Sequence, residues 1–506
     1  LDPTKYFRST LYMGTGAVQT IAQDSNSYFN EYGSGDRTSI ITAGAVGGSY
    51  NPAAGSNLIN GNKTDGSGIT SYATDQYFFF EFNEAVNITE VTIFTQSPYS
   101  GYNLGSAWIW EGSNDDWTTT TALSSAIDMS SNDVIEVHTL NLIGSTDTYS
   151  YYRIRNSNGS GVNSNFWEEF EFKVGATRSS LTRSTFQPDW VWLKNRSQAD
   201  GHMLIDAPRG VTKEISSDST AKESTDANGL TAFTSSGFTL GTGAGGYNDV
   251  GESFVAWQWL AGGGAGSSNT TGSINTITTT VNTTAGISIS TFTGSGVSGD
   301  TIGHGLGAIP KMILLKKTAN YDTQWTVYHA GNTSAPATEF MVLNASNATS
   351  DYLGAWNDTL PSSTLITLGN DSVTNESAMT YVVYAFAEVE GFSCLSSYVG
   401  NGAASLGTPV FCGFKPAYVM IKKASSTGNW VIYDSARSPY NEADDQLLAN
   451  TTAAETTGSE EIDFLATGFR VRASDSDINS SNGFYVYAAF ASNPFGATDV
   501  PPATTF

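Results

Sequence analysis

The sequence predicts an all-β protein built from tandem β-sandwich modules in three related copies, with a further domain inserted in the first copy. Aromatic residues make up 12% of the chain and charged residues only 14%, while Gly, Ser, Thr and Asn are abundant. No long segment places apolar residues at the helical spacing of about 3.6 residues. One phrase occurs three times, as FQPDWVWLKN (186–195), IPKMILLKK (309–317) and FKPAYVMIKK (414–423).

Each copy of this phrase contains a proline, an apolar strand and a lysine that follows the proline by six positions. Proline lacks an N–H group and is tolerated at the entrance of a strand. The strand is apolar at consecutive positions, so both of its faces are predicted to be covered, as in the centre of a sandwich. Each copy ends on an aromatic-rich strand, at 253–261, 380–388 and 483–491.

The first sandwich is predicted to be split by the inserted domain. Copies two and three begin with a strand and a Gly-x-Gly turn (286–296 and 391–402), and the matching pattern for the first copy lies at 6–22. Such an insertion is tolerated because loop-closure entropy grows slowly with length. The predicted boundaries are 1–22 plus 184–261 for the first sandwich, 35–175 for the inserted domain, 262–284 for a flexible or extended Gly/Ser/Thr-rich linker, 285–390 for the second sandwich, 391–496 for the third and 497–506 for a tail. Without a linker, the second and third sandwiches are predicted to pack rigidly end to end.

The formal net charge of −25 argues against duplex nucleic acid and anionic membrane surfaces as partners. No apolar run reaches the ~18–20 residues of a membrane span, so membrane insertion is not expected. With two cysteines, Cys394 and Cys412, no disulfide framework is predicted. The two flank a predicted hairpin, where they either face each other or serve as small apolar core residues.

The motifs of common enzyme classes do not appear, so a non-enzymatic protein is predicted. The sequence holds no Gly-x-Ser-x-Gly elbow and no phosphate-binding loop. Its histidines have no metal-ligand spacing; they are His138, His202, His304 and His329.

An Asp-x-x-Arg spacing occurs in the first and third copies, as Asp206 with Arg209 and Asp434 with Arg437. The second copy has His329 at the aspartate position and no arginine. A catalytic pair would not be repeated with one copy missing. We therefore expect ion pairs that each hold a loop in place.

The inserted region carries its own motifs: NLINGNKTDG (57–66), WEGSNDDW (110–117), YYRIR (151–155) and EEFEFKV (168–174). Their order resembles the discoidin, or coagulation factor F5/8 type C, family of galactose-binding-like jelly rolls. This resemblance implies a jelly roll over 35–175 that binds glycans through loops at one end. It also implies a structural calcium ion.

Glycan binding needs aromatic faces for sugar C–H groups and polar neighbours for hydroxyl groups. Three loops of the inserted region offer both, and the candidate glycan contacts are Tyr50, Tyr99, Tyr102, Asn156 and Asn163. For calcium, the resemblance points to the oxygen ligands Asn60, Asn62, Asp65 and Glu169. Asn60 stands where the family usually has an acid. The tryptophans Trp108, Trp110 and Trp117 are predicted to be structural, because Trp more often fills a core than a binding face.

The repeats carry a second set of motifs, including YMGTGAVQTIA (12–22), FQPDWVWLKNRS (186–197), IDAPRGVTKEI (205–215) and GNWVIYDSARSPYN (428–441). They are similar to modules in tail-fibre and structural proteins of marine bacteriophages. The resemblance implies a virion appendage whose partners are a host cell-surface glycan and other virion proteins. It also favours a homo-oligomer, with a trimer first, although the sequence contains no coiled-coil heptads.

Two alternatives remain open at this point. The chain is either a structural virion decoration protein that binds only other virion proteins, or a secreted bacterial carbohydrate-active protein with an accessory binding module. Release of reducing sugar would identify the second alternative.

Overall fold

The structure is a computed structural model of the 506-residue chain. It describes residues 1–23, 41–46, 58–59, 67–69, 75–86, 88–96, 107–127, 135–141, 148–157, 165–174, 185–242, 246–438, 441–458 and 461–492. In these ranges the regular elements are the strands β1–β35, the 3-10 helix η1 (Pro3–Lys5) and the short helix α1 (Leu353–Trp356). The prediction of an all-β fold is confirmed. No helix in the described ranges has the length and hydrophobicity needed to cross a bilayer.

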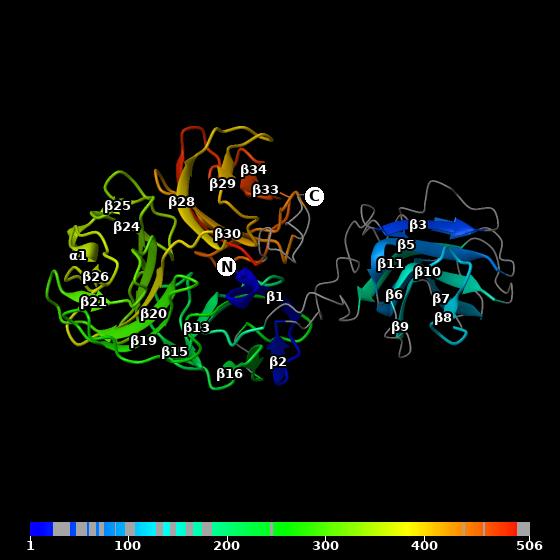
Figure 1. The fold of residues 1–506 in the computed structure, drawn as a ribbon, viewed down its shortest axis with the longest axis horizontal. Coiled ribbons are helices and arrows are strands. Elements are labelled where there is room, and N and C mark those ends of the chain that lie inside the picture. Colours follow the sequence, from blue (N-terminus) through cyan, green and yellow to red (C-terminus); the bar gives the residue numbers. More distant parts are fainter. Residues whose placement is uncertain are drawn as a thin grey trace. The chain divides into compact units, whose positions relative to one another are not determined.

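The chain divides into two compact units. Unit 1 comprises Leu1–Asp24 and Arg183–Phe506, and unit 2 comprises Ser25–Thr182 between these two segments (Figure 1). Unit 1 holds three sandwiches, called here module 1 (β1, β2 and β12–β18), module 2 (β19–β27) and module 3 (β28–β35).

Module 1 is a two-sheet antiparallel sandwich. Its large sheet has the order β1 (Phe7–Met13), β18 (Ser253–Trp259), β12 (Trp190–Asn195), β13 (Met203–Asp206). Its small sheet has the order β16 (Leu230–Thr234), β17 (Gly237–Leu240), β2 (Gln19–Ala22), and β14 (Lys213–Glu214) pairs with β15 (Ser224–Thr225). Because β1 pairs with β18 along its whole length, the N-terminal strand lies in the sheet that contains Trp190 and Trp192.

Module 2 begins earlier than the sequence predicted. Its large sheet has the order β19 (Thr276–Asn282), β20 (Ile287–Thr293), β27 (Thr380–Phe386), β22 (Met312–Lys317), β23 (Thr326–His329), β24 (Glu339–Val342), β25 (Ser350–Asp351), and β21 (Thr301–Gly303) pairs with β26 (Leu365–Thr367). Strand β19 falls inside 262–284, so the prediction of a linker is wrong for that stretch. The reason is its run of β-branched residues, which favours a strand once β20 is available as a partner.

Module 3 repeats the plan. Its large sheet has the order β28 (Ser393–Val399), β35 (Phe484–Phe490), β30 (Tyr418–Lys423), β31 (Trp430–Asp434), β32 (Leu447–Leu448), and its small sheet has the order β29 (Pro409–Phe411), β34 (Gly468–Val471), β33 (Ile462–Leu465).

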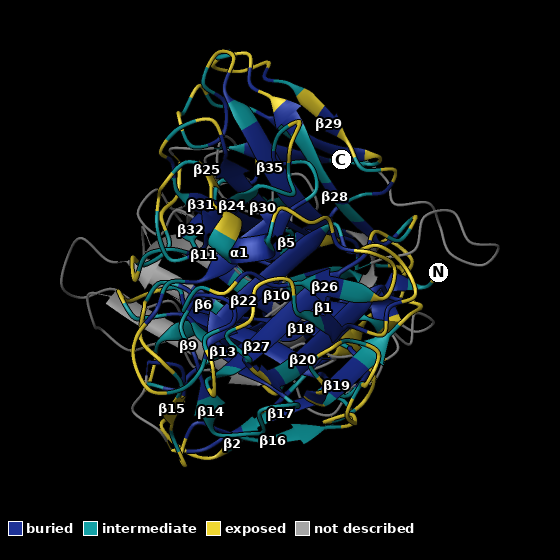
Figure 2. Cartoon of the chain, turned by 90° about the vertical axis from the view of Figure 1, so that its left-hand side faces the viewer, coloured by how far each residue is buried: buried dark blue, intermediate teal, exposed yellow. Residues whose placement is uncertain are grey.

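The three central strands β12, β22 and β30 are buried along their whole length, and the core explains why. One face of each strand packs inside its own module. The opposite face packs into a core shared by all three modules, through Trp190 and Trp192, Met312 and Leu314, and Tyr418 and Met420. Figure 1 shows the modules grouped around this common centre, and Figure 2 shows β18, β22 and β27 as buried. The expected end-to-end packing is therefore wrong: the modules surround one core.

The lysine of each repeated phrase joins its module to a neighbouring one. Its Nζ atom donates to a backbone carbonyl there. The bonds run from Lys194 to Thr452 (3.1 Å), from Lys316 to Thr220 (2.8 Å) and from Lys422 to Ser346 (3.2 Å). Module 1 thus contacts module 3, module 2 contacts module 1 and module 3 contacts module 2, which closes a ring within one chain.

A second set of bonds follows the same cyclic order. At each interface, a ring nitrogen of an aromatic side chain bonds a backbone carbonyl of the neighbouring module. This carbonyl belongs to the residue four positions before the one that accepts the bond from the lysine. The bonds join His202 to Leu448 (3.0 Å), Trp325 to Ser216 (2.8 Å) and Trp430 to Val342 (2.8 Å). The three interfaces are therefore equivalent in register.

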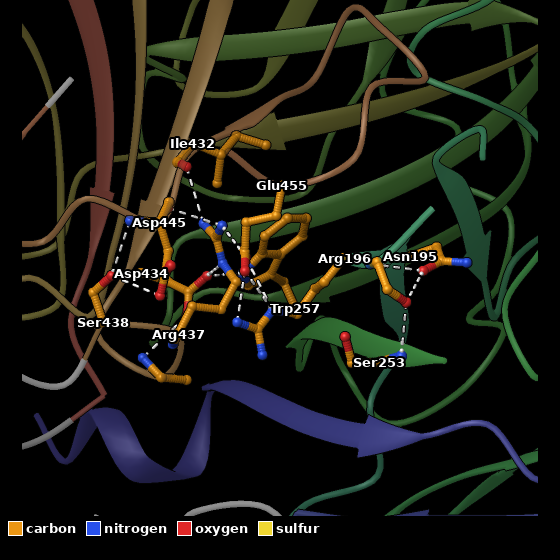
Figure 3. A network of polar contacts seen from close by, with 12 residues as sticks. Asn195, Arg196, Ser253, Trp257, Ile432, Asp434, Arg437, Ser438, Asp445 and Glu455 are labelled. Carbon is orange, nitrogen blue, oxygen red and sulfur yellow. Dashed lines mark hydrogen bonds and ion pairs between the residues drawn. The ribbon is translucent and has the colours of Figure 1, made fainter. Parts of the chain in front are cut away.

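The interface between modules 1 and 3 also holds a buried network of charges (Figure 3). Glu455 accepts from Arg196 of module 1 at 2.6 Å and from Arg437 at 3.0 Å. Arg437 also pairs with Asp434 at 2.5 Å, and both side chains are fully buried. The predicted ion pairs of the Asp-x-x-Arg motifs are confirmed at Asp434 and, equally buried, at Asp206.

Unit 2 is a sandwich of two antiparallel sheets. One has the order β3 (Ile41–Val46), β5 (Tyr77–Val86), β10 (Tyr149–Asn156), β7 (Trp108–Ser113), β8 (Thr121–Ala122), and the other has the order β4 (Ser67–Ile69), β11 (Asn165–Val174), β6 (Ile88–Gln96), β9 (Ile135–Asn141). Aromatic side chains dominate the core between them, including Phe78, Phe80, Phe82, Trp108, Trp110, Phe170 and Phe172. The structural role predicted for Trp108 and Trp110 is confirmed, since both are fully buried.

Candidate functional site

The outward face of the five-stranded sheet of unit 2 carries aromatic and charged side chains. Strand β10 alternates, so Tyr152 and Ile154 point into the core while Tyr151, Arg153 and Arg155 are only half-buried. Strand β5 does the same, with Tyr77 and Phe79 half-buried beside buried neighbours. Neighbouring strands therefore place these outward side chains side by side.

The loop between β7 and β8 adds Trp117 to this face. Trp117 has φ 68° and Asp116 has φ 50°, a left-handed conformation that is uncommon outside glycine and needs support from its surroundings. The carboxylate of Asp115 accepts from the backbone N of Thr119 at 2.8 Å and from its hydroxyl at 2.7 Å. Ser113 Oγ accepts from the backbone N of Trp117 at 3.1 Å.

A second set of bonds attaches this loop to β10. The side chain of Asn114 donates to the carbonyl of Thr148 at 2.8 Å and accepts from the backbone N of Ser150 at 2.8 Å. The hydrogen bonds from Thr119 hold the pKa of Asp115 below its ordinary value, so this carboxylate stays ionised at neutral pH. The loop is thus fixed to the strand whose outward residues it approaches.

The side chains on this face form a cluster. The ring of Trp117 lies 5.9 Å from that of Tyr77 and 5.8 Å from that of Tyr151, between centroids. The Arg153 guanidinium lies 4.6 Å from the Trp117 centroid and 4.8 Å from the Tyr77 centroid, within cation–π range. We call Tyr77, Trp117, Tyr151 and Arg153 the aromatic cluster.

Charge on this face is largely balanced. Glu111, with a side chain only 7% exposed, accepts from Arg153 at 2.6 Å and from Arg155 at 2.7 Å. Burial favours the neutral acid, but the hydrogen bonds and charges of the two arginines outweigh it and lower the Glu111 pKa. Arg155 also reaches Asp75 at 2.7 Å. The guanidinium groups are therefore held in place by carboxylates.

Exposed acids border the aromatic cluster. Glu81 and Asp116 are both exposed, and the charge of Glu81 is the main reason that the pKa of Tyr151 is raised. Their carboxylates and the tyrosine hydroxyls can bond neutral hydroxyl groups of a ligand. The arrangement suits a neutral polar molecule with an apolar face.

The predicted glycan contacts are only partly described. Tyr50, Tyr99, Tyr102 and Asn163 lie outside the described residues. Asn156 ends β10 and is fully buried, with its backbone N bonded to the carbonyl of Gln76 at 2.8 Å. A side chain without exposed surface cannot contact an external sugar, so the prediction for Asn156 is wrong. Asn156 instead lies where β10 and β7 meet.

The structure does not test the predicted calcium ligands. Asn60, Asn62 and Asp65 lie outside the described residues. Glu169 is in β11, opposite Phe94 of β6. The calcium ion therefore stays a prediction.

Trp117 lies at the surface, so the prediction that it only fills the core is wrong for this tryptophan. Trp117 is half-buried, unlike Trp108 and Trp110. A signal was available: in YSYYRIR (149–155), strict alternation assigns Tyr151, Arg153 and Arg155 to one face. The Asp-Asp-Trp turn beside that face could then have been assigned to the same surface.

One group of acids in unit 1 has oxygen atoms close enough to hold a metal ion. Oxygen atoms of Asp200, Asp249 and Glu252 lie within 4.8 Å of one another. The amide of Asn195 donates to Asp200 at 2.6 Å and to Glu252 at 2.5 Å. All-oxygen sets suit hard cations, but here a protein amide already satisfies two of the carboxylates.

The described histidine side chains of unit 1 are structural. His202, His304 and His329 are buried, and each bonds a backbone carbonyl. Burial is the main cause that lowers the pKa of His202 to about 3 and that of His329 to about 4. Both imidazoles are therefore neutral at physiological pH.

Comparisons with known proteins give one family and several structures. The profile of a family described as "Domain of unknown function (DUF7483)" matches residues 163–494. No curated protein matches the sequence.

The similar solved structures include carbohydrate-binding modules (CBMs). CBM32-1 from a family 31 glycoside hydrolase of Clostridium perfringens is 18% identical, with 26% of this chain and 93% of that chain covered at a TM-score of 0.21. The family 32 CBM of C. perfringens NanJ, in complex with galactose, is 18% identical, with 28% and 97% covered at 0.22. CBM62 of Clostridium thermocellum Xyl5A is 19% identical, with 26% and 91% covered at 0.21. TM-scores this low carry no argument about the ligand of this chain.

Proposed function

This chain belongs to the DUF7483 family, whose description assigns no activity, and from the geometry of its inserted unit we propose that it is a carbohydrate-binding protein. Unit 2 binds the sugar through the aromatic cluster. The observation that carries the proposal is Trp117, held in a left-handed turn beside Tyr77 and Tyr151 on an outward sheet face.

The chemistry of a sugar matches this face. A pyranose has C–H groups that pack on aromatic rings and hydroxyl groups that bond carboxylates and phenols. The cluster offers Trp117 and the tyrosines for the first and the exposed acids Glu81 and Asp116 for the second. Because both arginines are paired with Glu111 and Asp75, neutral sugars fit better than sulfated or uronic acid sugars.

The role of the chain is a further part of the proposal. We place it on a bacteriophage virion as a non-enzymatic fibre or receptor-binding protein that recognises a host-surface glycan. The support is the resemblance of its repeats to phage structural modules. The alternatives are a decoration protein that binds only virion proteins and a secreted bacterial carbohydrate-active protein. Antibody labelling of purified particles separates the first two from the third.

The binding test uses the full chain on an array of neutral, sulfated and uronic acid glycans, followed by calorimetry with the best ligand. Trp117→Ala should weaken binding about thirtyfold, since an aromatic anchor of an interface contributes ~2 kcal/mol. Phe411→Ala is the matched control, because Phe411 is an aromatic residue of unit 1 that is 73% exposed.

The proposal predicts that the melting temperature of both variants stays near that of the wild type. A chain that binds no glycan on the array contradicts carbohydrate binding. Binding that survives Trp117→Ala contradicts the assignment to the aromatic cluster.

A further inference from the structure

The two cysteines of the chain lie on the two sheets of module 3. Cys394 is in β28 of the five-stranded sheet, and Cys412 directly follows β29 of the three-stranded sheet. Both are half-buried and pack against the core of this module. The sequence left open whether they face each other or simply fill space.

The hydroxyl group of Tyr487 places the two thiols together. Its Oη atom lies 3.2 Å from Sγ of Cys394 and 3.9 Å from Sγ of Cys412. Both thiols therefore contact the same hydroxyl group. Two sulfur atoms from opposite sheets thus lie on either side of one tyrosine hydroxyl group, close enough for a small movement to bring them together.

The environment makes the two thiols unequal. Interaction with the Cys412 thiol lowers the pKa of Cys394, although burial acts against this. The same interaction, together with burial, raises the pKa of Cys412. Since the thiolate is the reactive form, Cys394 is the first nucleophile of the pair. Its partial exposure gives a small molecule access.

We propose that Cys394 and Cys412 are an oxidisable pair, which a low-molecular-weight disulfide such as glutathione disulfide converts to a disulfide between the two sheets of module 3. The Cys394 thiolate attacks one sulfur of glutathione disulfide and releases one glutathione thiolate. The deprotonated Cys412 then attacks the Cys394 sulfur of the mixed disulfide and releases the second glutathione. Two protein thiols are oxidised and one disulfide is reduced, so electrons and protons balance.

This bond would enclose residues 395–411, a segment that contains most of β28 and all of β29; these strands lie in different sheets, so the hairpin that the sequence predicted between the cysteines is wrong. Cross-linking removes conformations from the unfolded chain. The melting temperature of the oxidised protein should therefore exceed that of the reduced protein, by an amount on the order of 5 °C. The inference is independent of carbohydrate binding.

The experiment treats the folded, full-length chain with glutathione disulfide and follows intact mass and free thiols. The expected product is a monomer that has lost both thiols and about 2 Da, one hydrogen per sulfur. Cys412→Ser should stop at one glutathione adduct on residue 394, whereas Cys394→Ser should react more slowly at residue 412.

Three outcomes overturn the proposal. They are a stable double glutathione adduct, a disulfide between two chains, and thiols that react only after denaturation. Each single variant retains one thiol, and the glutathione adduct on that thiol is measured directly by mass. The test therefore still gives an answer if one of the two variants folds poorly.

Discussion

Nε1 of Trp257 donates a 3.0 Å hydrogen bond to Oδ2 of Asp434, and this bond joins module 1 to module 3. At the equivalent place between modules 2 and 1, the hydroxyl of Tyr384 donates to Asp206 at 2.6 Å. Between modules 3 and 2, Ala488 occupies the position of the donor and has no side-chain N–H or O–H group. His329 occupies the position of the carboxylate. Two of the three interfaces thus keep a buried bond to a carboxylate.

Replacing Trp257 by Phe should lower the free energy of unfolding of unit 1 by ~2 kcal/mol, because a buried bond to a charged group is lost. Denaturant unfolding followed by tryptophan fluorescence measures the change. Trp356→Phe is the matched control: it removes a similar volume from a core, but the Nε1 atom of Trp356 has no bonding partner in the part of the chain that the structure describes. Equal effects of the two substitutions would contradict a role for the bond.

Glu455→Gln should destabilise unit 1 by ~3 kcal/mol, because it leaves the buried guanidinium of Arg437 and that of Arg196 with less compensating charge. Chemical denaturation measures the loss. Glu442→Gln is the control, since Glu442 pairs with Arg472 at the surface. Its effect should be small and should disappear in high salt. If Glu455→Gln changed the free energy of unfolding as little as the control does, the prediction would be contradicted, because the two guanidinium groups would then not depend on the charge of Glu455.

Asp445 should make unit 1 less stable as the pH rises from about 4 to about 6. Burial, and then the charge of Glu455, raise the pKa of Asp445 to about 6. The unfolded chain releases this proton first, so the contribution of Asp445 is fully present below its unfolded pKa and is lost on the way to its folded pKa. Asp445→Asn removes this dependence. The difference in melting temperature, variant minus wild type, should grow over this interval and then level off; a constant difference would contradict the assignment.

The shared core has a small apolar cavity lined by residues of all three modules, among them Trp190, Met312 and Ala488. Ala488 stands where modules 1 and 2 have Trp257 and Tyr384. Ala488→Leu should stabilise unit 1 by ~1 kcal/mol by filling this space.

Ala489→Leu is the matched control for the cavity. Ala489 is fully buried on the opposite face of β35, in the core of module 3 itself. A larger side chain there should destabilise by ~1–3 kcal/mol through overpacking. The same sign of effect at both positions would contradict the cavity assignment.

Much of the fold could be predicted from the spacing of apolar residues along the sequence. The strand WVWLKN (190–195) is apolar at consecutive positions, which predicted a strand covered on both faces, and the structure buries all of it. What covers the second face could not be read from the pattern, because apolar residues do not specify their partner. The structure shows that the partner is the core shared with the other two modules.

The candidate site was harder to predict. Tyr151 and Arg153 alternate with core residues, so their outward direction follows from the strand period alone. The position of Trp117 depends on a left-handed turn held by side-chain bonds to Asp115 and Ser113. Such a turn has no simple sequence rule. Asn156 failed for a related reason: its loop-like neighbours concealed that it still belongs to β10.

Because the ring of three sandwiches closes within a single polypeptide, every position in it exists once per molecule. A trimer of identical chains would have to place any guest domain in all three subunits and to keep all three contacts alike. Covalent fusion removes both constraints. One copy alone accommodates unit 2, and the contact at Ala488 differs from the other two. A molecule of this design offers a single copy of unit 2, so any gain in avidity for a ligand of that unit has to come from the number of molecules on a surface.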